Sequence, residues 1–230
     1  MDTSADMTFV KAILFDLDGT LLNTLQDLAD SMNEVLTARG LPGHPVPEYR
    51  YFVGDGMREL ARRVYPGNNP PEEMIDLLVE EMRIEYGKRC YDTTGPYEGV
   101  DEMLEYIAGS GVPMAVFSNK PHEFTMEMVA YYFKDIPFRV VMGVNEWVPR
   151  KPDPAGALMI SKKIGIEPKN FLYLGDTATD MNTATSSGMY PAGAAWGFRD
   201  EQELRHNGAQ IILDTPRQLT RMLKKVFNTK

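Results

Sequence analysis

Three short polar segments bring together reactive side chains. These segments, residues 16–20, 118–120 and 175–180, each follow an apolar run directly. Their side chains of chemical interest are Asp16, Asp18, Thr20, Ser118, Asn119, Lys120, Asp176 and Asp180. Close carboxylates repel one another, so four acids that share a cleft require a balancing cation. Mg²⁺ favours carboxylate oxygens and is often bound together with a substrate phosphate. The acids therefore indicate a site for magnesium and phosphate.

Positive charge and hydrogen-bond donors accompany the acids. Ser118, Lys120 and Lys151 supply the groups that a phosphoryl group requires during its transfer. Each segment also has a purely structural explanation, because Asp and Gly favour turns and Ser, Thr and Asp favour the starts of helices. These explanations give no reason for acids and cations to recur at successive strand ends. The recurrence favours a phosphoryl-transfer site.

The elements that must position these side chains alternate between strands and helices. Apolar runs predict strands at residues 11–15, 112–117, 139–142, 171–174 and 211–213. Patterns of helical period predict helices at residues 100–108, 123–133, 154–164, 181–187 and 217–227. Such alternation predicts an α/β fold with a Rossmann-like, doubly wound and mostly parallel sheet. Ligands bind beyond the carboxyl ends of the strands in these sheets, which is where the polar segments lie.

One stretch interrupts the alternation. Helical patterns at residues 24–39, 57–65 and 72–88 follow one another without a strand, and residues 41–50 are rich in Pro and Gly and predict a loop. We therefore expect an all-helical domain at residues 24–95, inserted into a core made of residues 1–23 and 96–230.

Composition narrows the class of partner. The chain has 24 Lys and Arg against 33 Asp and Glu, a net charge of −9, which argues against nucleic acid and anionic membranes as partners. Cys90 is the single cysteine, so an intrachain disulfide and a multi-cysteine metal site are excluded. The sequence shows no secretory signal and no apolar run near the ~20 residues that span a bilayer. We expect a cytoplasmic protein.

Four motifs resemble those of the haloacid dehalogenase-like hydrolase superfamily, in the order found there. They are FDLDGTL at residues 15–21, FSNK at 117–120, RKPDP at 150–154 and LGDTATD at 174–180. The helical insert resembles the cap domain of that superfamily. Within the superfamily, the chain is most similar to phosphoglycolate phosphatases. Three segments carry this similarity, namely VGDG at residues 53–56, Pro96-Tyr97 and SNKP at residues 118–121.

The resemblance implies a role for each motif residue. Asp16 would be the nucleophile that forms an aspartyl-phosphate, Asp18 the general acid and base, and Thr20 the residue that orients Asp18. The residues expected to bind the substrate are Ser118, Asn119, Lys151, Gly54, Gly56 and Arg58, with Ser118 and Lys151 on the phosphate. The expected ligands of Mg²⁺ are the Asp16 carboxylate, the Asp18 backbone carbonyl, Asp176 and Asp180, the last directly or through water.

The function implied is a Mg²⁺-dependent phosphomonoester hydrolase that acts on a small phosphorylated metabolite. The substrate implied is 2-phosphoglycolate, and the protein is expected to be a monomer or a homodimer. Alternatives are a phosphosugar mutase similar to β-phosphoglucomutase, a pyrophosphatase, and another sugar or nucleotide phosphatase. The predicted helix at residues 24–39 lacks the histidine that those mutases carry near its start. A phosphate-binding protein without catalysis is the alternative outside enzymes, against which the complete motif set argues.

Overall fold

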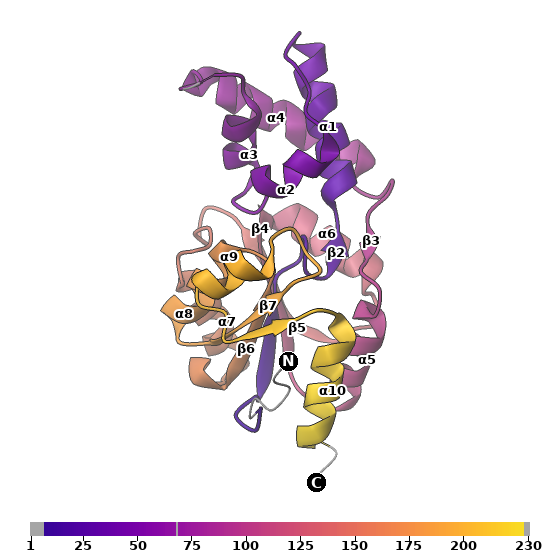
Figure 1. The fold of residues 1–230 in the computed structure, drawn as a ribbon, viewed down its shortest axis with the longest axis vertical. Helices are drawn as coiled ribbons and strands as arrows, with labels where there is room; N and C mark the ends of the chain where they lie inside the picture. The colour runs from indigo at the N-terminus through magenta and orange to yellow at the C-terminus, as the bar shows by residue number, and fades with distance from the viewer. Residues whose placement is uncertain (1–6, 68, 228–230) are drawn as a thin grey trace.

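The structure is a computed structural model that describes residues 7–67 and 69–227. Its centre is a six-stranded parallel sheet in the order β5-β4-β1-β6-β7-β8 (Figure 1). The strands are β1 (Ala12–Phe15), β4 (Met114–Pro121), β5 (Phe138–Val144), β6 (Phe171–Gly175), β7 (Tyr190–Ala194) and β8 (Ile211–Leu213). With the helical insertion between β1 and β4, this architecture confirms the predicted fold class.

Helices cover both faces of the sheet. They are α5 (Val100–Gly109), α6 (His122–Tyr132), α7 (Ala155–Ile164), α8 (Ala178–Ser187), α9 (Glu201–His206) and α10 (Pro216–Phe227). Successive strand residues point to opposite faces. Ile13 and Phe15 accordingly share one buried cluster with residues of α5, α6 and α10, whereas Ala12 and Leu14 share another with residues of α7 and α8. Burial on both faces explains why the strands are continuous apolar runs.

The helical insertion stands at one end of the sheet (Figure 1). It contains α1 (Leu25–Ala38), the short η1 (Val46–Glu48), α2 (Tyr49–Phe52), α3 (Met57–Val64) and α4 (Glu72–Arg89). An antiparallel pair, β2 (Leu22–Asn23) with β3 (Gly95–Pro96), joins the two chain segments that connect the insertion to the core. The predicted cap, residues 24–95, begins directly after β2 and ends at the first residue of β3. We call helices α1 to α4 the cap.

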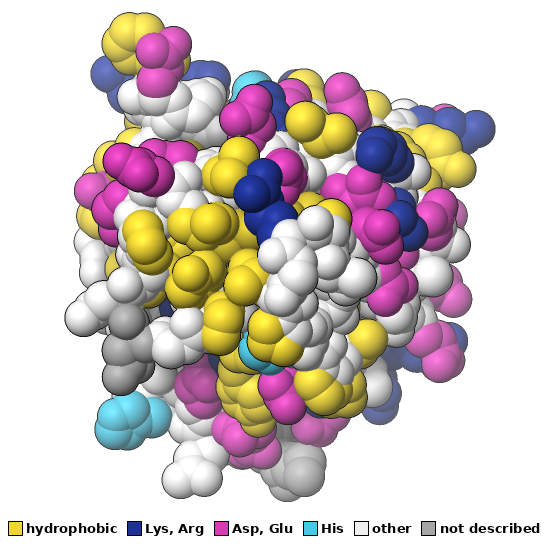
Figure 2. Space-filling view, turned by 90° about the horizontal axis from the view of Figure 1, so that it is seen from above, with side chains coloured by type: hydrophobic (Ala, Val, Ile, Leu, Met, Phe, Trp, Pro, Cys, Tyr) yellow, Lys and Arg dark blue, Asp and Glu magenta, His cyan; other side chains and the backbone are white. Residues whose placement is uncertain are grey.

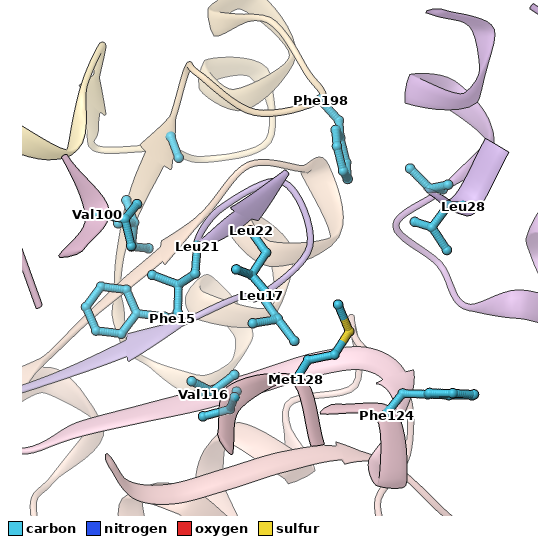
Figure 3. Close-up of a cluster of buried hydrophobic side chains, with 14 of the residues drawn as sticks. Phe15, Leu17, Leu21, Leu22, Leu28, Val100, Val116, Phe124, Met128 and Phe198 are labelled. Carbon is cyan, nitrogen blue, oxygen red and sulfur yellow. The ribbon is translucent and has the colours of Figure 1, made fainter. Parts of the chain in front are cut away.

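The turn after β1 is anchored by leucines. Leu17, Leu21 and Leu22 are fully buried and extend from this turn into the cluster around Phe15 and Val116 (Figure 3). The backbone amides of Thr20, Leu21 and Leu22 all donate to the carbonyl of Leu17, the last two at 2.9 Å. The polar side chains of this turn therefore stand on a rigid base at the edge of the sheet.

Among the elements that the sequence patterns did not predict are the core strand β7 and the core helix α9. The strand β7 contains Pro191 and Gly193, which are poor strand formers. A Cβ at Gly193 would lie 2.7 Å from Ile212 Cδ1 and 3.2 Å from Leu204 Cβ, so a side chain there would crowd β8 and α9. The short α9 was also missed, and η1 lies inside residues 41–50, where we expected only a loop. The strand β4 runs through Pro121, four residues beyond its predicted end.

The surface mixes both signs of charge. Seen from the cap end, Lys and Arg side chains stand among Asp and Glu, with hydrophobic side chains gathered on part of this face (Figure 2). Across the residues that the structure describes, none of the helices combines the length and the apolar character that crossing a bilayer would require.

Candidate active site

Three neighbouring strands bring the predicted polar segments together. Asp16 follows β1, Asp176 follows β6, and Ser118 lies near the end of β4, the other neighbour of β1. All three side chains are buried. Carboxylate oxygens of Asp16, Asp176 and Asp180 lie within 4.8 Å of one another. The carboxyl edge of the sheet therefore concentrates negative charge at one point.

Lys151 bridges two of these acids. Its Nζ lies 2.8 Å from Asp16 Oδ1 and 2.7 Å from Asp180 Oδ1. The second oxygen of Asp180 accepts from the amide and the hydroxyl of Thr177, which begins α8. Burial alone would lower the pKa of Lys151, but the charges of Asp16 and Asp180 raise it well above its ordinary value. Lys151 is therefore a fixed cation between two carboxylates.

One lysine does not balance three buried acids. Burial and, to a smaller extent, the charge of Asp180 raise the pKa of Asp16 well above its ordinary value. The same two causes raise the pKa of Asp176 to about 7. Additional positive charge would relieve this repulsion. Buried carboxylate oxygens that are short of positive charge suit a hard divalent cation such as Mg²⁺, so the residues present fit the expected ion.

This shortage of charge gives a prediction for the metal-free protein. The pKa of Asp176 is about 7 in the folded chain, against an ordinary value of 3.8 in the unfolded chain, so the folded chain binds this proton more tightly. The free energy of unfolding should therefore fall as pH rises from 3.8 to about 7. Mg²⁺ should raise the melting temperature more at about pH 8 than at about pH 5, because it replaces the lost protons. Thermal unfolding with Mg²⁺ and with EDTA measures both effects, and equal shifts at the two pH values would contradict the prediction.

Thr20 contacts a different acid from the one we expected. Its hydroxyl donates to Asp176 Oδ1 at 2.8 Å, whereas we predicted that it orients Asp18. The amide of Phe198 donates to the other Asp176 oxygen, also at 2.8 Å. The reason lies at Gly19, which has a φ of 86° and lies so close to Asp176 that an added Cβ would be 2.2 Å from Oδ2. This tight turn directs Thr20 toward the end of β6.

Asp18 is instead bound by Lys120. The Lys120 Nζ lies 2.7 Å from Asp18 Oδ1 and 2.9 Å from Oδ2. The lysine side chain is 1% exposed and that of Asp18 is 16% exposed. The sequence placed Lys120 with Ser118 and Lys151 among the groups that a transferring phosphoryl requires. Its pairing with Asp18 is the part that the sequence did not predict.

A small cavity lies between these residues and the cap. It is lined by Asp16, Asp18, Leu28, Val53, Gly54, Gly56, Met57, Leu60, Ser118, Asn119, Lys120 and Pro121. The core side of this cavity is polar, whereas the cap side is mostly apolar. Four of the predicted substrate-binding residues line it, namely Gly54, Gly56, Ser118 and Asn119. A group that reacts at Asp16 would thus face the acids with one end and the cap with the other.

Two predicted substrate-binding residues, Lys151 and Arg58, are not part of this lining, and Arg58 is bound by acids of the cap. Its guanidinium lies 2.5 Å from Glu72 Oε2 and also pairs with Asp76, both on α4. Arg58 does not line the cavity beside Asp16. The helix α3 thus places the Arg58 guanidinium against α4, and its contact with substrate stays a prediction.

Core side chains hold the cap loop that enters the cavity. Three successive backbone carbonyls of this loop accept hydrogen bonds from three different core residues. The pairs are Arg199 Nη2 with Val53 O (3.1 Å), Asn119 Nδ2 with Gly54 O (3.0 Å) and Arg150 Nη1 with Asp55 O (3.1 Å). Asn119 also accepts from the amide of Lys151 at 2.8 Å. Asn119 therefore connects the cap loop to the backbone that carries the site lysine.

The fold and the site together define a family. The sequence family described as "Haloacid dehalogenase-like hydrolase" matches residues 13–194. This span contains the eight polar residues named at the strand ends and the whole cap. The chain belongs to this family of hydrolases.

Particular relatives are enzymes that act on phosphate esters. The chain is 28% identical to the phosphoglycolate phosphatase of Pseudomonas putida, over 92% of this chain and 79% of that protein. It is 31% identical to the N-acetylmuramic acid 6-phosphate phosphatase of Pseudomonas aeruginosa, over 95% and 96%. A crystal structure described as a "predicted phosphoglycolate phosphatase" from Haemophilus somnus superposes with a TM-score of 0.86 at 27% identity, over 95% and 100%.

Proposed function

We propose that this chain is a Mg²⁺-dependent phosphomonoester hydrolase that works through an aspartyl-phosphate on Asp16. The observation that carries the proposal is the pairing of two carboxylates with different surroundings in one cavity. Asp16 is buried and bound by Lys151, whereas Asp18 is partly exposed and bound by Lys120. Two acids in such different settings can perform two different tasks.

In the first step, a carboxylate oxygen of Asp16 attacks the phosphorus and the bond to the leaving oxygen breaks. Asp18, as the carboxylic acid, gives its proton to that oxygen. In the second step, Asp18 takes a proton from a water that attacks the phosphorus, which releases phosphate and restores Asp16. Ser118 lines the cavity beside Asp16 and the Lys151 Nζ lies 2.8 Å from Asp16 Oδ1, so in this proposal each donates to the phosphoryl oxygens.

The metal site in this proposal is the cluster of Asp16, Asp176 and Asp180. Mg²⁺ bound there would neutralise the acids and let an anionic nucleophile approach an anionic ester. The hydroxyl of Thr20 and the amide of Phe198 each donate to one oxygen of the Asp176 carboxylate. These contacts keep the carboxylate in place before any ion binds.

The first substrate in this proposal is 2-phosphoglycolate. The support is the name carried by several relatives that span most of this chain. A relative of similar length carries the name N-acetylmuramic acid 6-phosphate phosphatase, so that ester is the second substrate to test. The cavity lining contains no histidine among the residues described there, which disfavours a mutase.

Turnover of p-nitrophenyl phosphate tests the reaction. We expect turnover with Mg²⁺ and none with EDTA, and turnover that survives EDTA would contradict the proposal. Values of kcat/KM for 2-phosphoglycolate, N-acetylmuramic acid 6-phosphate, sugar phosphates and pyrophosphate test the substrate. A low rank for 2-phosphoglycolate in this panel would overturn the substrate and leave the reaction in place.

A further inference from the structure

Lys120 uses all of its hydrogen-bonding capacity around Asp18. A lysine ammonium has three protons to donate and accepts none. Two of its contacts are the Asp18 oxygens described above, and the third is the hydroxyl of Tyr86 at 3.0 Å. The Lys120 side chain is almost fully buried, so water does not compete for these bonds. The position of Lys120 therefore depends on both Asp18 and Tyr86.

Tyr86 comes from the cap rather than from the core. It lies in α4, is fully buried, and places its ring centroid 4.7 Å from the Lys120 Nζ, within the range of a cation–π contact. Its hydroxyl accepts from Lys120 and donates to the sulfur of Met128 at 3.6 Å. Burial, followed by the charge of Asp18, raises the pKa of Tyr86 well above its ordinary value, so the hydroxyl keeps the proton that it donates.

The core helix α6 also contacts the Tyr86 side chain. Met128 and Phe124 both belong to α6, and the rings of Phe124 and Tyr86 meet edge to face with centroids 5.4 Å apart. A continuous chain of contacts thus runs from α6 through Tyr86 and Lys120 to Asp18. The chain is complete only while α4 lies against α6, because Tyr86 is its one member from the cap.

We propose that Tyr86 and Lys120 are positioning residues for the acid–base step: Tyr86 holds Lys120, and Lys120 holds the carboxyl group of Asp18 toward the leaving oxygen when α4 is seated on the core. This inference rests on the proposed function, in which Asp18 is the general acid. Lys120 keeps its contact with one oxygen of Asp18 while the other oxygen gives its proton to the leaving group. Lys120 itself stays protonated throughout.

The chemistry of the leaving group makes this role measurable. An alkyl phosphate releases a strongly basic alkoxide, so its reaction depends on a well-placed acid. p-Nitrophenyl phosphate releases a weakly basic phenolate, whose departure needs little protonation. Loss of Asp18 positioning should therefore slow the alkyl ester far more than the aryl ester. A general loss of packing or of phosphate binding would slow both esters alike.

Tyr86→Phe is the main test, because it removes only the hydroxyl and keeps the ring beside Lys120. We expect kcat/KM for 2-phosphoglycolate to fall about 10-fold, and that for p-nitrophenyl phosphate to fall less than about 2-fold. In Lys120→Met, the loss of kcat/KM for 2-phosphoglycolate should exceed the loss for p-nitrophenyl phosphate by a larger factor than in Tyr86→Phe. Lys120→Arg should restore part of the kcat/KM for 2-phosphoglycolate. The matched control is Tyr49→Phe, because Tyr49 is another fully buried cap tyrosine whose hydroxyl donates to Asn33 and not to Lys120.

Each outcome decides the inference. A selective loss with the alkyl ester in Tyr86→Phe, absent in Tyr49→Phe, supports it. Equal losses with the two esters, or no loss, overturn it while wild-type turnover keeps the proposed function standing. Absence of wild-type turnover on both esters overturns the proposed function and this inference with it. If melting curves show that Tyr86→Phe does not fold, the ratio measured for Lys120→Met and Lys120→Arg decides in the same way.

Discussion

Asp16→Asn is expected to lower kcat by at least about 10⁴-fold, the scale of losses seen when a catalytic nucleophile is removed. Asparagine has nearly the same shape, but its amide cannot attack phosphorus to form the acyl phosphate. The same change should raise the melting temperature of the metal-free protein. Burial and the charge of Asp180 disfavour the ionised form of Asp16, and the neutral amide removes that cost. Activity and metal-free stability should thus change in opposite directions.

Steady-state turnover and thermal unfolding in EDTA measure the two effects. Asp135→Asn serves as the control, because Asp135 is exposed and distant from the site in the fold. It should leave both quantities unchanged. Residual turnover of Asp16→Asn above about 1% of wild type would exclude Asp16 as the nucleophile. A fall in metal-free stability would instead show that Asp16 is needed mainly as the partner of Lys151.

The fold was predictable where burial imposes a simple pattern. Strands such as β1 and β6 lie between two layers of helices, so every residue is apolar and the run stands out. The sharp change from apolar to acidic at Asp16 and Asp176 then located the edge of the sheet. The strand β7 escaped prediction because Pro191 and Gly193 are poor strand formers, and the close packing of Gly193 against β8 and α9 is not recorded in any local propensity.

The site was predictable in its membership but not in its pairings. Thr20 contacts Asp176, which lies 156 residues away along the chain, and Lys120 contacts Asp18 over 102 residues. These pairings depend on the turn at Gly19 and on which strands are neighbours in the sheet. The sequence patterns did not single out Tyr86. Only the docking of α4 on the core reveals its hydroxyl beside Lys120.

Lys151→Met should affect both activity and stability. The substitution keeps an unbranched apolar stem of similar length but removes the cation between Asp16 and Asp180. Breaking a buried ion pair from one side costs about 3–5 kcal/mol, because it leaves the other charge uncompensated. We expect a loss of this order in the free energy of unfolding at about pH 8 in EDTA. The loss should shrink at lower pH, since protonation of Asp16 and Asp176 relieves the repulsion.

Activity separates the two roles of this lysine. If Lys151 also donates to the phosphoryl group, kcat/KM should fall about 10³-fold even when saturating Mg²⁺ restores the melting temperature. Lys151→Arg keeps the charge but changes its shape, so it should recover stability more than turnover. Denaturant unfolding with and without Mg²⁺, beside turnover of p-nitrophenyl phosphate, tests both expectations. Recovery of full activity by Mg²⁺ in Lys151→Met would mean that the lysine serves only to neutralise the acids, because a cation of either kind would then suffice.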